Sequence, residues 1–229
     1  MKRRQDRRSN PSLAAPRRKP AELPTTTSAR PQSTRPAVVD RLPSMKIGAI
    51  MQLFQNALRI LAEPARSSQH TAARQVLDAI DQEWVRRAML PPNPEDFFAW
   101  PTTNAPGGDG SLDTRGWLAE GLLRFMEYRV GNTNGVATPV RRALLSEVFS
   151  ANLPPAFYRD YLDQWGRPSS AARLQKMAES IAAFTRNAKR RKTRELVAAI
   201  RDWEDDLRFL YETYYVRHFH FAWPSNELS

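Results

Sequence analysis

The chain has 229 residues, of which 41% are hydrophobic, and a formal net charge of +11 at pH 7. That length and apolar content suffice for one or two domains with a buried core. The absence of cysteine excludes a disulfide framework and a thiolate metal site. No apolar stretch approaches the roughly 20 residues that a membrane-spanning helix needs, and no signal-peptide core follows the basic start. We expect a cytoplasmic protein that does not enter the membrane.

The first 43 residues carry most of the positive charge. They hold eleven Lys and Arg against three acidic residues, which gives +8 of the total +11, and seven of the 18 prolines. With almost no large apolar residue, this segment cannot bury enough surface to offset the entropy lost on ordering. The sequence therefore predicts a disordered basic tail over residues 1–43. A transit peptide has a similar composition, but the prolines would interrupt the amphipathic helix that it needs.

A helical domain is predicted over residues 44–168. After Ser44, a possible N-cap, apolar residues recur at spacings of three and four until Pro64 ends the first helix. A second helix is predicted from Ser68 to Met89, before a pair of prolines. Because the connection between them is short, the two helices should form an antiparallel pair.

Residues 91–110 are predicted to be a loop, because prolines and glycines interrupt any periodic pattern there. The loop contains the tetrapeptide Phe-Ala-Trp-Pro, which returns at residues 221–224. These aromatic side chains either cover edges of the core, as aromatic residues commonly do, or dock a partner protein. The candidate docking residues are Phe98, Trp100, Phe221 and Trp223.

Two helices with a glycine-containing turn between them follow the loop. The first is predicted from Arg115 to Tyr128, and the second begins at Thr138 as N-cap with Pro139 behind it. In a DNA-binding helix-turn-helix the first turn of the second helix reads bases, and Arg141 and Arg142 fall in that turn. The turn of about nine residues is longer than that motif uses, so an ordinary helical hairpin is the alternative.

A helical hairpin with an aromatic C-terminal segment is predicted over residues 169–229, packed on the same core. A short helix from Ala156 to Gln164 leads into it, and Ser169 or Ser170 caps its first long helix. In its second helix, apolar residues recur at the heptad spacings of four and three: Leu196, Ile200, Trp203, Leu207, Leu210 and Tyr214. The whole folded part is therefore predicted to be all-α.

The joint between the two hairpin helices is dense in positive charge. Six of the nine residues 186–194, here called the basic joint, are cationic: Arg186, Lys189, Arg190, Arg191, Lys192 and Arg194. Clustered cations attract phosphates, and Lys and Arg are rarely buried without a partner. The basic joint is thus a candidate nucleic-acid contact. The alternative is a solvated turn whose cations stabilise the C-terminus of a helix.

The sequence contains no residue pattern that clearly indicates metal binding or catalysis. The acidic run Asp202 to Asp206 offers oxygen ligands, but Asp202 and Asp206 lie on one face of the helix while Asp205 points elsewhere. A solvated face paired with arginines is therefore favoured over a metal site. His218 and His220 would need a third ligand, and His70 is the only other histidine. No phosphate loop, nucleophile elbow or zinc-protease motif is present. We expect no cofactor, no metal and no enzymatic activity.

Several short strings occur together: Met126-x-Tyr-Arg-Val-Gly131, Trp165-Gly-x-Pro168, Arg173-Leu174, Arg186-Asn-Ala-x-Arg-Arg191, Ala199-Ile-x-Asp-Trp-Glu-x-Asp-Leu207 and the closing Phe-x-Trp-Pro. They resemble a group of uncharacterised bacterial proteins over roughly residues 90–224. The resemblance implies a bacterial or phage cytosolic setting. It brings no activity and no site residues with it.

Three hypotheses from different functional classes can be compared. The first is a non-catalytic accessory protein that binds the phosphate backbone of DNA or RNA through its basic tail and basic joint. The second is a helical adaptor or scaffold subunit of a multiprotein complex, which docks a protein partner through its aromatic segments or heptad face. The third, an enzyme that uses a metal held by the acidic run, is the least supported.

Overall fold

The computed structural model describes residues 36–91, 121–155 and 159–227. All regular structure in these ranges is helical, which confirms the predicted all-α class. None of the helices described there is both long and apolar enough to cross a membrane. In chain order they are η1 (Val39–Ser44), α1 (Ile47–Ala62), η2 (Pro64–Gln69), α2 (His70–Ala88), α4 (Leu122–Phe125), α5 (Thr138–Ser150), α6 (Arg159–Asp163), α7 (Ala171–Arg191), η3 (Arg194–Leu196), α8 (Val197–Leu210) and the π-helical turn η4 (Tyr211–Tyr215).

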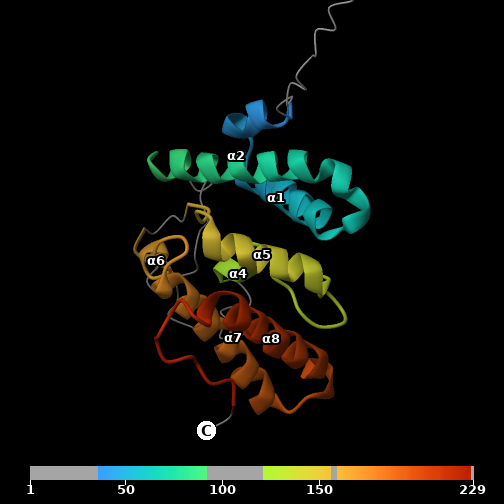
Figure 1. Cartoon of the computed structure of the whole chain (residues 1–229), viewed down its shortest axis with the longest axis vertical. Helices are drawn as coiled ribbons and strands as arrows, with labels where there is room; N and C mark the ends of the chain where they lie inside the picture. The colour runs from blue at the N-terminus through green and yellow to red at the C-terminus, as the bar shows by residue number, and fades with distance from the viewer. Residues whose placement is uncertain (1–35, 92–120, 156–158, 228–229) are drawn as a thin grey trace, which may run out of the picture. The chain divides into compact units, whose positions relative to one another are not determined.

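Helix α5 connects two helix pairs. α1 packs on α2 and α7 packs on α8, while α5 contacts α1, α7 and α8 (Figure 1). One apolar cluster runs through all five helices, and Ile50, Ile80, Leu145 and Ile181 within it are at most 1% exposed. The apolar periodicity of the sequence predicted both pairs, because each long helix buries one stripe against its neighbours.

The helix ends follow caps and prolines, with small shifts from the predicted positions. Ser170 caps α7 as predicted, since its Oγ accepts a hydrogen bond from the backbone N–H of Arg173 at 3.2 Å. Thr138 is already helical, and Ala137 takes the N-cap position of α5. Ser44 does not cap α1, because its hydroxyl donates to the carbonyl oxygen of Arg41 at 2.9 Å. The side chain of a short polar residue near a helix start can form a hydrogen bond with backbone groups on either side of the helix boundary.

The predicted loop 91–110 and the helix predicted after it lie partly outside the described residues. Of the loop 91–110, only residue 91 is described, so Phe98 and Trp100 are not placed. Of the helix predicted from Arg115 to Tyr128, the described part is α4, which ends at Phe125. Glu127 then adopts a left-handed φ of 67°, a conformation that ends a helix. The prediction therefore placed this helix end too late.

The predicted tail boundary at residue 43 is wrong. η1 lies inside that segment, and its Val39 and Leu42 are buried in the core. Arg87 of α2, 1% exposed, holds η1 in place by donating to the carbonyl oxygens of Leu42 at 3.1 Å and Met45 at 2.5 Å. A short 3₁₀ turn tolerates the prolines that would break a longer helix. The rest of the predicted tail, residues 1–35, lies outside the described residues.

Glu83 should make the stability of this region depend on pH. Burial raises its pKa, but hydrogen bonds from Arg86 and Arg87 outweigh burial and hold the pKa below its ordinary value. A carboxyl whose pKa is lowered by folding stabilises the protein above the unfolded pKa, and this contribution is lost as the pH falls through the folded pKa. We expect Glu83→Gln to lower the melting temperature at pH 7 and to flatten its decline below about pH 4.3. Thermal unfolding followed by circular dichroism between pH 7 and pH 3 checks this, and identical acid limbs for the two proteins would contradict it.

Candidate nucleic-acid interface

The basic joint consists of the last turns of α7 and the reversal into α8. Lys189, Arg190 and Arg191 occupy the final turn of α7, where the helix dipole favours positive charge. Lys192 follows in the left-handed conformation, with φ 51° and ψ 31°. Its backbone N–H donates to the carbonyl oxygen of Lys189 at 3.3 Å and closes the helix. Arg194 is the first residue of η3. The chain therefore reverses direction within a few residues, most of which are positively charged.

Two of the six cations are bound by α8 or by the C-terminal segment of the protein. Arg186 donates a hydrogen bond to the carbonyl oxygen of Ser225. The Nζ atom of Lys189 lies 2.9 Å from the carboxylate of Glu204 and 3.3 Å from that of Glu227. Hydrogen bonds to these carboxylates, chiefly to Glu204, raise the pKa of Lys189. Lys189 therefore stays protonated, and much of its positive charge is neutralised locally.

The other four cations of the basic joint are exposed: Arg190, Arg191, Lys192 and Arg194. The guanidinium of Arg190 contacts the side chain of Asn187 at 3.4 Å. Among the described residues, no carboxylate forms an ion pair with any of the four. Exposed cations without carboxylate partners create a positive potential that a polyanion can neutralise.

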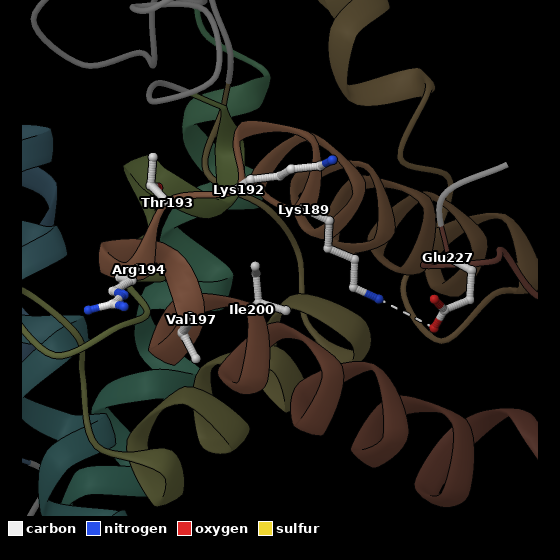
Figure 2. A pocket seen from close by; sticks show the side chains of 7 residues that line it. All are labelled: Lys189, Lys192, Thr193, Arg194, Val197, Ile200 and Glu227. Atoms are coloured by element: carbon white, nitrogen blue, oxygen red, sulfur yellow. Dashed lines mark hydrogen bonds and ion pairs between the residues drawn. The ribbon is translucent and has the colours of Figure 1, made fainter.

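A hollow of about 450 Å³ opens at the basic joint (Figure 2). Its lining combines cationic or polar side chains with apolar ones: Lys189, Lys192, Thr193 and Arg194 on one hand, Val197 and Ile200 on the other. Glu227 also lines it, and Figure 2 shows Lys189 reaching toward that carboxylate while Arg194 points away from it. Val197 is 54% exposed. The hollow thus presents positive charge beside exposed apolar surface, with one acidic group at its border.

The predicted nucleic-acid role of Arg141 is wrong. Its side chain is 3% exposed, and its Nε donates to Asp206 at 2.8 Å while its Nη2 donates to Asp202 at 3.1 Å. Its Nη1 donates to the carbonyl oxygen of Val136 at 2.9 Å. The hydroxyl of Tyr128 donates to the same Asp206 carboxylate at 2.7 Å. The guanidinium is committed to a buried cluster between α5 and α8 and cannot reach a phosphate.

The ionisation of this buried cluster follows from its contacts. Burial raises the pKa of Asp206, and hydrogen bonds from Arg141 and Tyr128 oppose that rise. Burial lowers the pKa of Arg141, but the Asp206 hydrogen bond and charge outweigh burial and raise it. Burial and the Asp206 charge raise the pKa of Tyr128, so its hydroxyl remains a donor. Asp206 is 0% exposed, so the expected solvated face is wrong for this residue. The expected pairing with arginine is observed, and Asp202 and Asp205 remain partly exposed.

Arg142 is exposed, as a binding residue would be, but it lies apart from the hollow. Its guanidinium sits 5.2 Å from the centre of the Phe209 ring, which is the geometry of a cation–π contact. With Arg141 turned inward against α8, the first turn of α5 lacks the free base-reading face that a helix-turn-helix requires. The geometry favours the alternative of ordinary helix packing.

The aromatic C-terminal segment packs onto its own helix. The ring of Phe221 lies 4.9 Å from that of Tyr215, and the ring of Trp223 lies 5.2 Å from Tyr211 and 4.9 Å from Tyr215. Both Phe221 and Trp223 are partly buried against the core. This packing favours the first of the two alternatives, in which the rings cover an edge of the core. Both rings remain partly exposed, and docking of a partner stays a prediction.

Within the described ranges, no group of three His, Asp or Glu residues is placed to hold a metal ion. Comparison with protein-family models, with curated proteins and with solved structures found no match for this chain. The case for a function therefore rests on the geometry and charge of the chain itself.

The sequence did not lead us to predict the buried charged side chains, although the spacing of two of them along their helices indicates burial or pairing. Asp206 is seven residues after Ala199 and four before Leu210, both buried, so it lies on the buried face of α8 and needs a cation. Arg87 lies four residues after Glu83, the spacing of a helical ion pair. Arg173 left no signal, because it binds carbonyl oxygens, which every residue carries.

Proposed function

We propose that this chain is a non-catalytic accessory protein that binds the phosphate backbone of DNA or RNA through the basic joint. The observation that carries the proposal is the cluster of four exposed cations, Arg190, Arg191, Lys192 and Arg194, without a carboxylate partner in the described part of the chain. Cations that neutralise phosphates release condensed counterions, and this release drives association. The basic residues among the first 35 would add contacts of the same kind. A cytoplasmic setting belongs to this proposal.

The geometry favours backbone binding over base recognition. Phosphate contacts orient a protein on nucleic acid but carry no sequence information. The exposed cations lie at the C-terminal end of α7 and in the reversal that follows it, whereas groove readers place a helix face or a β-ribbon against base edges. The exposed apolar side chain of Val197 beside the hollow can contact a sugar or a base without selecting one. Binding should therefore depend steeply on salt and weakly on sequence.

Removing the four exposed cations should weaken nucleic-acid binding without unfolding the protein. The variant combines Arg190→Ser, Arg191→Ser, Lys192→Gly and Arg194→Ser. Glycine suits position 192, because it adopts the left-handed φ of 51° without strain. We expect the slope of log affinity against log salt to fall in magnitude by up to about 0.9 for each lost phosphate contact on duplex DNA, while the melting temperature holds. Filter binding against salt measures this, in the full chain and in a chain that begins at residue 36 and so keeps η1.

Two controls sharpen that experiment. A variant that loses the same charge elsewhere, at the exposed residues Arg59, Arg66, Arg124 and Arg208, should bind more tightly than the joint variant. Glu227→Gln should act in the opposite direction and tighten binding by up to about fivefold, because it removes an exposed carboxylate that competes for Lys189. Glu212→Gln, also exposed, is its matched control. Unchanged affinity and salt slope for the joint variant in the shortened chain would refute the proposal and leave the adaptor function ahead.

A further inference from the structure

A buried cation lies beside a second hollow, at the start of α7. Arg173 is 3% exposed, and its Nε donates to the carbonyl oxygen of Trp165 at 3.0 Å. Its Nη1 donates to the carbonyl oxygens of Val148 at 2.7 Å and Ala151 at 3.1 Å, and its Nη2 donates to that of Gly166 at 2.7 Å. A guanidinium has five N–H groups, so these four bonds leave one N–H on Nη2 without a partner among the described residues.

The four carbonyl oxygens explain where Arg173 sits but do not neutralise it. Val148 and Ala151 belong to the C-terminal end of α5, whose last carbonyls have no helical partner and accept from a cation. No carboxylate among the described residues pairs with Arg173, and burial lowers its pKa to about 10. A full positive charge in a low-dielectric surrounding favours an anion nearby much more strongly than an exposed cation does.

The hollow that Arg173 lines has the size and lining of a small-molecule site. Its volume is about 550 Å³, within the usual range for such sites. Apolar side chains form much of its lining, namely Trp84, Leu153, Leu162 and Pro168. The side-chain amide of Asn152 is already bound to Asp81, at 3.0 Å. The remaining charged groups, Asp163 and Arg167, are exposed and opposite in sign, so Arg173 gives the lining a net positive charge.

We propose that this hollow binds a small organic anion, consisting of a carboxylate on a flat apolar body. The carboxylate would accept from the remaining N–H of Arg173, and the body would lie against the apolar lining that includes Trp84 and Leu162. The hollow shares no lining residue with the basic joint. The inference therefore stands independently of nucleic-acid binding and adds a ligand site to the chain.

Isothermal titration of the full chain with 2-naphthoate and with the neutral isostere 2-naphthamide tests the proposal. We expect 2-naphthoate to bind at one site roughly tenfold more tightly than the amide, which is the difference made by one charge-assisted hydrogen bond. Ala88→Trp places a large side chain at the hollow from an exposed position of α2 and should abolish binding. Ala72→Trp, exposed on the same helix away from the hollow, should bind like the unmodified chain.

Arg173→Lys gives a second measurement, because it keeps the charge and removes the forked donor. In the folded variant, we expect the preference for 2-naphthoate over 2-naphthamide to shrink. Should that variant fail to fold, the comparison of Ala88→Trp with Ala72→Trp still decides the outcome. Equal affinities for the acid and the amide, no binding of the acid at about 1 mM, or unchanged binding by Ala88→Trp would each overturn the proposal.

Discussion

Replacing Asp206 by asparagine should destabilise the folded protein by about 3–5 kcal/mol, the usual cost of removing one partner of a buried ion pair. Asp206 is 0% exposed and accepts from both Arg141 and Tyr128, so its loss of charge leaves a buried guanidinium without its main counter-charge. Asp202 cannot fully replace this counter-charge, because its carboxylate is bound by one nitrogen atom of Arg141, at 3.1 Å, and its side chain is partly exposed. Denaturant unfolding of both proteins measures the difference.

The neighbouring carboxylate supplies the control for this experiment. Asp205 is partly exposed and pairs with Arg208 at 3.3 Å on the helix surface, so Asp205→Asn should change the free energy of unfolding by no more than about 0.5 kcal/mol. A double change, Arg141→Met with Asp206→Leu, should cost less than Asp206→Asn alone, because no fully buried charge is then left unpaired. Asp202 loses Arg141, but its side chain is 25% exposed and keeps the hydrogen bond from the backbone N–H of Gly131. Equal effects of Asp206→Asn and Asp205→Asn would show that the buried cluster does not hold α5 to α8.

The heptad pattern of α8 predicted the helix and its buried residues Leu207 and Leu210, but it did not predict that Ala199 and Asp206 are buried beside them. The apolar spacing placed Trp203 at the centre of the core. In the structure Trp203 is only partly buried, against Phe184 at 6.0 Å, while Ala199 and Asp206 are buried. The spacing of apolar residues indicates which side of a helix is buried. A charged residue on that side is stable only when another element supplies a partner for it. Because Arg141 lies 65 residues away in the chain, local spacing could not reveal the pair.

The candidate site, like the buried face of α8, was predictable only in part. Charge density along the chain identified the basic joint, and the four cations at its tip are exposed as that density indicated. The pairing of Lys189 with Glu227, 38 residues further along, depends on how the C-terminal segment returns to α7. Likewise, only the tertiary structure shows that Arg173 lines a hollow, because its hydrogen-bond partners are backbone carbonyls.

Replacing Arg87 by methionine should destabilise the protein by about 3 kcal/mol and release η1 first. Methionine keeps the apolar stem but removes the donor to Met45 and one of the two donors to Leu42, whose carbonyl oxygen still accepts from the N–H of Met45 at 3.1 Å. A buried acceptor left without a donor costs about 1–3 kcal/mol. Glu83 keeps its bonds from Arg86, which holds the loss toward the lower end of the range for a broken buried pair.

The order of events distinguishes this effect from general destabilisation. Arg41 is exposed within η1, so trypsin should cut after it in Arg87→Met under conditions where α1 and α2 remain intact. The control is Arg86→Met, whose side chain is 44% exposed and whose loss should cost at most about 1 kcal/mol. If cleavage after Arg41 were equally rapid in the unmodified chain, the anchoring of η1 would be refuted, and the folded part would begin at α1, as the predicted boundary at residue 43 implied. Slow cleavage that accelerates only in Arg87→Met would show that one buried guanidinium holds η1 on the core.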